Sequence, residues 1–257
     1  MDLTDAELER YARHIVLPQV GGVGQRKLKA ARVAVVGAGG IGSAVIPALA
    51  GAGVGRLTII DDDAVELSNL QRQTIFRDDQ LGAGKAAAAA AYAAALNPEI
   101  EAVAAAERIG ADNAQALLGG HDVIVDGCDN FATRLTVNEA AVRLQIPLVS
   151  AAAAQFQGQI ALLRGWLPDQ PCYRCFVGDA FDAEDCDTCA ELGVLGALTG
   201  AVGNLAALLG IRAIVGAGEE SQGKLFVIDA LAFSVRPIRI PKDPGCGTCG
   251  GGNAAGS

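Results

Sequence analysis

Residues that can hold a phosphate chain lie near the start of the sequence, in the stretch 32–73. Three glycines, Gly37, Gly39 and Gly42, follow a β-branched run, and Asp61 closes the next apolar run 19 positions after the last of them. Glycines at this spacing, with a carboxylate about 20 residues further on, are typical of a nucleotide-binding turn. The turn brings backbone N–H groups close to phosphates, and Asp61 can accept hydrogen bonds from ribose hydroxyls. The pattern predicts an adenine nucleotide and leaves open whether it is a redox cofactor or a substrate.

The loop after Asp61 favours a triphosphate. It reads DDDAVELSNLQRQ and places Asn69, Arg72 and Gln73 where a dehydrogenase has no use for them. Arg72 and Lys85 can both neutralise phosphate charge. Lys85 is the only charge in an alanine-rich helix, at the end where the helix dipole disfavours a cation. The alternative for both residues is an ordinary solvated charge.

Two carboxylates, Asp126 and Asp129, follow a further apolar strand, at the sheet edge where ligands bind in open α/β folds. Magnesium prefers one or two carboxylates together with substrate oxygens, so this pair is a candidate Mg²⁺ site beside a triphosphate. The alternative is an N-cap for the helix that follows, and one residue can serve both purposes.

Six of the seven cysteines form three C-x-x-C pairs, at positions 172/175, 186/189 and 246/249. In a cytosolic protein this spacing favours metal ligation or redox chemistry over structural disulfides. Four thiolates from two pairs make a tetrahedral structural Zn²⁺ site, and the spacing does not say which two pairs. The remaining cysteine, Cys128, is expected to be a buried core thiol.

Alternating strands and helices must position these residues. Apolar strands in such an alternation indicate a parallel sheet with helices on both faces. We expect strands at 33–36, 57–60, 100–105, 121–125 and 147–151, and helices after Gly42 and at 84–96, 112–118 and 132–144.

The two ends of the chain differ from this alternation. A capping box of Thr4 and Glu7 begins an N-terminal helix that runs toward residue 17, and 18–24 is expected to be a glycine-rich link. After the core come a strand at 157–164, a Gly/Ala helix at 196–215 and an antiparallel hairpin formed by 224–228 and 232–240.

Composition excludes several classes of protein. The length of 257 residues fits one large α/β domain, and the net charge of −9 argues against a nucleic-acid-binding surface. The longest uninterrupted apolar run, 86–96, is shorter than the roughly 20 residues of a membrane span. The acidic N-terminus lacks the features of a signal peptide. We therefore expect a cytoplasmic protein that binds neither nucleic acid nor a membrane.

Six segments resemble the MoeB/ThiF/HesA family, the bacterial relatives of ubiquitin-activating enzymes; they are GAGGIG, DDDAVELSNLQRQ, Lys85, DGCDN, PCYRC and PGCGTC. The resemblance covers about residues 4–250. It implies a Rossmann-like, doubly wound α/β fold whose mostly parallel sheet is extended by antiparallel strands, with a C-terminal tail pinned by zinc. It also implies one adenylation domain over 1–250, divided into an N-terminal helix (4–17), a nucleotide-binding core (31–150) and a carrier-binding and zinc part (151–250), before a disordered tail (251–257).

The same resemblance implies residue roles. Arg13, in the stretch RYAR, would reach the ATP held by the other subunit of a homodimer, and Asp129 would hold Mg²⁺. Cys189 matches the cysteine that family members use for thioester or persulfide chemistry, although its acidic neighbours disfavour a thiolate, and Cys186 has no counterpart. The resemblance implies that zinc is held by Cys172, Cys175, Cys246 and Cys249. The residues that would bind ATP are Gly37, Gly39, Gly40, Gly42, Asp61, Asp63, Asn69, Arg72, Lys85 and Asp129. The residues that would be catalytic are Arg13, Arg72, Lys85, Asp129 and Cys189.

The implied activity is ATP-dependent adenylation of the C-terminal glycine of a small ubiquitin-like sulfur carrier that ends in Gly-Gly, of the MoaD (molybdopterin) or ThiS (thiamine) kind. Sulfur would come from a separate donor, because no rhodanese-like segment follows Cys249. Two other classes of protein stay open. One is a nicotinamide-dependent oxidoreductase built on the same glycine turn, and the other is a non-catalytic protein that binds nucleotide and zinc.

Overall fold

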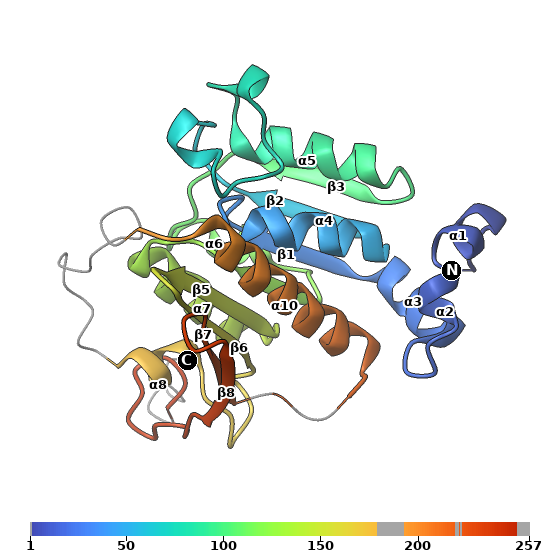
Figure 1. The fold of residues 1–257 in the computed structure, drawn as a ribbon. Coiled ribbons are helices and arrows are strands. Elements are labelled where there is room, and N and C mark those ends of the chain that lie inside the picture. Colours follow the sequence, from blue (N-terminus) through green and yellow to red (C-terminus); the bar gives the residue numbers. More distant parts are fainter. Residues whose placement is uncertain (1, 179–192, 219–220, 222, 251–257) are drawn as a thin grey trace.

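The structure, a computed structural model, describes residues 2–178, 193–218, 221 and 223–250. Its centre is one sheet of eight strands in the order β3-β2-β1-β4-β5-β6-β7-β8 (Figure 1). The strands are β1 Arg32–Val36, β2 Arg56–Ile60, β3 Glu101–Ala105, β4 Val123–Asp126, β5 Leu148–Ala154, β6 Gln157–Leu163, β7 Lys224–Asp229 and β8 Ser234–Arg239.

The direction of the strands confirms the predicted fold class. The pairs from β3 through β5 are parallel, and β6, β7 and β8 extend the sheet with antiparallel pairs. The chain adds β2 and β3 on one side of β1 and then returns to place β4 and β5 on the other side. Such a reversal opens a crevice at the carboxyl ends of the strands, where ligands bind in this class of sheet.

Helices cover both faces because successive strand residues point to opposite sides. Val33 and Val35 of β1 pack with α3, α4, α5 and α10, whereas Ala34 and Val36 pack with α6, α7 and α8. The helices are α1 Asp5–Arg10, α2 Ala12–Ile15, α3 Gly21–Ala30, α4 Gly42–Ala52, α5 Lys85–Leu96, α6 Ala114–Leu118, α7 Phe131–Leu144, α8 Tyr173–Val177 and α10 Gly196–Val215, with 3-10 turns η1 Leu67–Asn69 and η2 Asp78–Gln80.

Strand β5 is longer than its parallel partner. Only residues 148–150 of β5 pair with β4, whose last residue, Asp126, lies opposite Ser150. Residues 151–154 continue in register with β6. The β5–β6 hairpin therefore projects past the end of β4 and forms a wall at the carboxyl edge of the sheet.

Helix α10 has the length and composition of a membrane span. The sequence did not show this as one apolar run, because glycines interrupt it. Half of its most apolar 18-residue stretch is buried inside the protein. It packs on β4, β5 and β6 and against α3 and α4, so its apolar character is that of a core helix.

The N-terminal segment differs from the prediction. The single helix expected up to residue 17 is divided at Tyr11 into α1 and α2, because Tyr11 leaves helical geometry and buries its ring. The glycine-rich link expected at 18–24 is wrong: helix α3 begins at Gly21. A side chain at Gly24 would lie 2.9 Å from Val215 Cγ1, so this glycine permits close helix packing.

Tyr11 anchors this segment to the ends of α4 and α5. Its hydroxyl accepts a hydrogen bond of 2.8 Å from Asn97 Nδ2, and its ring lies against Gly53, which has a left-handed φ of 79°. A Cβ at Gly53 would stand 2.4 Å from Tyr11 Cζ.

We predict that Gly53→Ala destabilises the protein by about 2 kcal/mol or more, because it combines a clash with a strained backbone. Urea unfolding measures the loss. Gly51→Ala is the matched control: it lies on the same helix with open space around it and should change stability by no more than about 1 kcal/mol, in the favourable direction. Equal stability of the two variants would contradict the packing described for Tyr11.

Candidate functional site

One cavity of about 780 Å³ opens at the carboxyl edge of the sheet. One part lies at the β1/β4 reversal and the other follows the β5–β6 hairpin to α8. Eight of the predicted site residues line it: Gly37, Gly39, Gly40, Asp61, Asp63, Arg72, Lys85 and Asp129.

The glycine turn forms the floor of the first part. Gly37 has a φ of 88°, and a Cβ there would lie 3.2 Å from the backbone nitrogen of Cys128. A Cβ at Gly42 would lie 2.1 Å from the Gly37 carbonyl oxygen, so a glycine is required there for the tight turn into α4, and Gly42 is not among the described residues that line the cavity. At Gly39 the nearest atom would be Gln73 Nε2, 3.8 Å away, which leaves that stretch of backbone accessible to a phosphate.

Asp61 ties this turn to the following loop. Its carboxylate accepts hydrogen bonds from the backbone nitrogens of Ala38, at 2.7 Å, and Asp63, at 2.9 Å. Burial raises the pKa of Asp61, while these hydrogen bonds and the charge of Lys85 oppose the rise. The turn, the carboxylate and the loop therefore form one hydrogen-bonded unit.

Lys85 is a buried cation on the wall of the cavity. Its side chain is 7% exposed, and its ammonium lies 2.8 Å from the carboxylate of Asp63, which is 66% exposed. The partner explains how a lysine is tolerated at the start of α5, where the dipole disfavours it. Both residues line the cavity, so phosphate oxygens can approach the ammonium from it.

The loop 67–73 provides further polar groups. Arg72 donates to the Ser68 carbonyl oxygen at 3.1 Å and lines the cavity. Asn69 is buried outside the cavity lining. Gln73, which the sequence placed in this loop but not among the ligand-binding residues, is buried and lines the cavity. Among the described residues, Asn69 Oδ1 and Gln73 Oε1 are buried without a hydrogen-bond partner.

The two aspartates after β4 have different surroundings. Asp126 is buried and lies 4.0 Å from the Arg134 guanidinium. Asp129 is exposed and lines the cavity, so it is the carboxylate that can reach a ligand. The N-cap alternative is wrong for both, since Asn130 accepts the capping hydrogen bond from Thr133.

Cys128, which we expected in the core, lies at the wall of the cavity and is half-buried. The shielding of its thiol from water raises the pKa of Cys128 well above the usual range.

Arg13 and the middle cysteine pair stand apart from this cavity. Arg13 is exposed on α2, which packs on α3 at the amino-terminal side of the sheet (Figure 1). It is not among the described residues that line the cavity. Cys186 and Cys189 lie outside the described residues.

The outer cysteine pairs come together. The sulfurs of Cys172, Cys175, Cys246 and Cys249 all lie within 4.8 Å of one another, with Cys172–Cys246 at 3.6 Å and Cys175–Cys249 at 3.4 Å. Zinc–sulfur bonds of about 2.3 Å in a tetrahedron place sulfurs about 3.8 Å apart, so the cluster can hold Zn²⁺. It joins α8 to the segment after β8.

Known proteins resemble this chain over most of its length. The ThiF family model matches residues 11–248. The sulfur carrier protein adenylyltransferase of Thermus thermophilus is 42% identical over 255 residues, covering 97% of this chain and 93% of that protein. The SAMP-activating enzyme E1 of Haloferax volcanii is 40% identical, covering 98% and 92%. The molybdopterin-synthase adenylyltransferase of Salmonella typhimurium is 38% identical, covering 97% and 99%.

Solved structures share the fold. The crystal structure of E. coli MccB has a TM-score of 0.81 at 26% identity, covering 94% of this chain and 72% of that chain. MccB with MccA-N7isoASN has a TM-score of 0.83 at 24% identity, covering 95% and 74%. The names of the sequence relatives confirm the predicted class of enzyme, an adenylyltransferase, and do not support a nicotinamide-dependent oxidoreductase. The family model, the relatives and the fold agree with the site formed by the glycine turn, Asp61 and Lys85: the chain belongs to the ThiF family.

Proposed function

We propose that the protein uses ATP to adenylate the C-terminal carboxylate of a small ubiquitin-like sulfur carrier. The observation that carries the proposal is the form of the cavity, which has two connected parts. We call the glycine turn with Asp61, Asp63 and Lys85 the nucleotide cradle, and the part along β5–β6 the carrier channel. Such a space can hold ATP at one end and an extended peptide terminus at the other. The names of relatives that act on a sulfur carrier and on molybdopterin synthase support this substrate class.

The proposed reaction is an in-line displacement. A carboxylate oxygen of the carrier forms a bond to the α-phosphorus of ATP, and the bond from that phosphorus to the oxygen bridging the β-phosphate breaks. The electron pair leaves with pyrophosphate, and the carrier becomes an acyl-adenylate. Positioning and charge neutralisation account for most of the catalysis in such transfers. Arg72 and Lys85 lie on the cavity wall where they would offset the charge that develops on the phosphates.

Asp129 fits a magnesium ligand, since it offers a hard oxygen in the loop that packs against Gly37. Bound there, Mg²⁺ would neutralise charge on the departing pyrophosphate. Asp126 does not fit this role, because its carboxylate is buried beside Arg134.

The carrier would dock where the channel leaves the sheet. Gln155 and Gln157 line the cavity at the β5–β6 turn, next to Phe156. The backbone nitrogen of Ala230 donates to the Phe156 carbonyl oxygen at 2.9 Å, so the β7–β8 turn lies beside it. We call Phe156, Leu231 and Phe233 the hairpin patch; they are 41%, 77% and 95% exposed. An apolar patch beside a peptide-sized channel suits a folded partner whose tail enters the cavity.

A homodimer would complete the site. Arg13 on α2 lies away from the cavity of its own chain. Exposed apolar side chains lie nearby at the end of α2 (Val16) and on α3 and α10, which pack together (Val23, Leu205 and Leu208). A second copy that covers this face would bring its Arg13 toward the nucleotide.

Zinc in the four-cysteine cluster would fasten the segment after β8 to α8. The roles of Cys189 and of the separate sulfur donor, and the choice between a MoaD-like and a ThiS-like carrier, stay predictions.

The exchange of pyrophosphate into ATP, measured with purified protein, Mg²⁺ and candidate carriers, tests the reaction. Arg72→Ala and Asp129→Ala should each lower the rate about 100-fold or more, because each removes a group that acts on transition-state charge. Arg77→Ala and Asp79→Ala are matched controls, since this exposed ion pair of 3.2 Å follows the same loop, and both should keep near-normal rates. ATP binding without exchange on any carrier would favour the non-catalytic class.

Phe233→Asn tests the docking surface. Asparagine tolerates the φ of 52° found at Phe233, so the change removes the ring without straining the turn. The KM for the carrier should rise by about fivefold or more, as expected for a central apolar anchor, while the KM for ATP stays unchanged. Leu96→Ser, an equally drastic change of an exposed side chain at the end of α5, should alter neither constant. An unchanged KM for the carrier would place docking elsewhere.

Cys246→Ala tests the metal cluster. Metal analysis should find about one zinc per chain in the wild type and none in this variant, whose melting temperature should fall because the tail is no longer fastened. Cys128→Ala removes a thiol outside the cluster and should keep its zinc. A zinc-free wild type with an unaltered melting temperature after chelation would refute a structural metal.

A further inference from the structure

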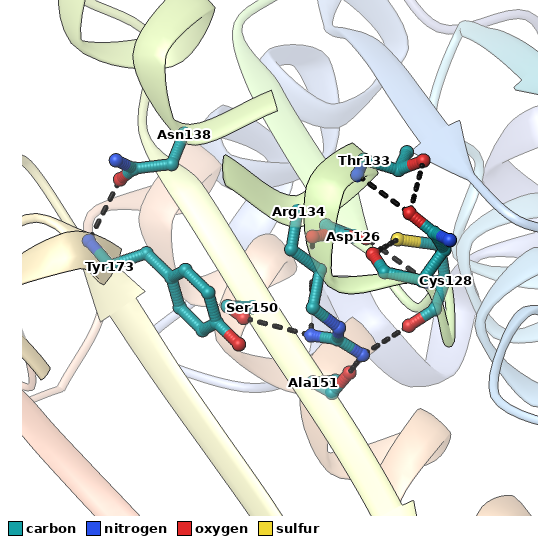
Figure 2. A network of polar contacts seen from close by, with 9 residues as sticks. Asp126, Cys128, Thr133, Arg134, Asn138, Ser150, Ala151 and Tyr173 are labelled. Carbon is teal, nitrogen blue, oxygen red and sulfur yellow. Dashed lines mark hydrogen bonds and ion pairs between the residues drawn. The ribbon is translucent and has the colours of Figure 1, made fainter. Parts of the chain in front are cut away.

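Arg134 is a buried cation that the proposed chemistry does not use. It lies in the first turns of α7, is 5% exposed and lines the cavity beside the loop 127–130 (Figure 2). A charge this deep is costly unless hydrogen bonds and an opposite charge compensate it. Its guanidinium has such partners on two elements of the fold.

The guanidinium connects the loop after β4 to strand β5. One nitrogen donates to the carbonyl oxygens of Cys128 and Ala151, the latter at 2.8 Å. The other lies 3.3 Å from Ser150 Oγ and 4.0 Å from the Asp126 carboxylate. Figure 2 shows these groups converging on Arg134 from the loop on one side and from β5 on the other.

The contacts of Arg134 begin where the pairing of β4 with β5 ends. The β4–β5 ladder ends with Asp126 opposite Ser150. Beyond that pair, no backbone hydrogen bond joins the loop 127–130 to β5 within the described part of the chain. Arg134 contacts the first residue of β5 past the ladder, Ala151, and the loop residue next to Asp129. Arg134 therefore links the loop that carries Asp129 directly to β5.

The start of α8, which lies next to Arg134, is also held by α7. Tyr173 is buried against Phe131 and Phe176, with ring centroids 6.0 and 6.2 Å away, and its ring points toward Arg134 in Figure 2. Its backbone nitrogen donates at 2.7 Å to Asn138, one helical turn after Arg134. The inner face of α7 therefore holds both the loop and the start of α8.

We propose that Arg134 is a positioning residue: it clamps the loop 127–130 to β5 and so sets where the Asp129 carboxylate stands between the nucleotide cradle and the carrier channel. This inference rests on the proposed function, in which Asp129 holds Mg²⁺ bound to ATP. A planar guanidinium suits this task, because its fixed fork of donors reaches acceptors on two elements at once. A lysine ammonium keeps the charge and loses that geometry.

The test compares Arg134→Lys and Ser150→Ala with the wild type. Arg143→Lys is the control, because this arginine lies on the same helix in an exposed ion pair with Glu139. Binding of Mn²⁺ in the presence of a non-hydrolysable ATP analogue is followed through the loss of the free-ion paramagnetic resonance signal. Pyrophosphate exchange gives kcat and the KM for the carrier, and thermal melting shows that each variant is folded.

Arg134→Lys should weaken Mn²⁺ binding and lower kcat by about tenfold or more, the usual cost of removing a group that orients a metal ligand. The KM for the carrier should stay unchanged. Ser150→Ala removes one contact and should shift Mn²⁺ binding by about two- to fivefold in the same direction. Arg143→Lys should match the wild type.

Wild-type Mn²⁺ affinity in a folded Arg134→Lys protein would overturn the inference while the proposed function stands. If that variant does not fold, wild-type Mn²⁺ affinity and kcat in Ser150→Ala would overturn it instead. A wild type that neither binds Mn²⁺ with nucleotide nor exchanges pyrophosphate would overturn the proposed function, and the inference with it.

Discussion

The pairing of β1 with β2 on one side and β4 on the other is the constraint on which the site depends. Five residues of β1 are in register with β2 and four with β4, so the glycine turn after Val36 emerges between two strand ends. The strand ends supply Asp61 from β2 and the loop 127–130 from β4. Residues from three separate segments thus meet at one cavity because the sheet fixes their backbone first.

Glycines allow these segments to pack closely against one another. Gly42 lies against Gly37, and Gly203 of α10 would meet the Ile41 carbonyl oxygen at 2.5 Å if it carried a Cβ. Helix α10 can therefore lie directly over the start of α4. The same contact supports the floor of the cradle from the face opposite α7, so both faces of the sheet contribute to holding the turn.

Much of this arrangement could be predicted from the sequence. The strand–helix alternation and the glycine–carboxylate spacing gave the parallel core and the edge at which Asp61, Lys85 and Asp129 meet, because both signals are local and periodic. Helix α3 was missed since Gly21, Gly22 and Gly24 have low helix propensity, and packing against α10 overrides it. Arg134 was missed because one arginine in a helix looks solvated until its neighbours on β5 are known. Its spacing of four residues from Asn138 is a sequence signal that the two polar side chains share one face of α7, the buried one.

The four-cysteine cluster has a consequence for the order in which the protein matures. Its two halves are separated by 74 residues, and the second half lies at the end of the described chain. At synthesis rates of about 5–20 residues per second, the first pair of thiols waits about 4–15 s for the second to be made. The nucleotide cradle, whose strands all precede residue 155, can form during that time. Closing the cluster is therefore a late step, and Cys172 and Cys175 stay without their partners in the cluster until the second pair has been made.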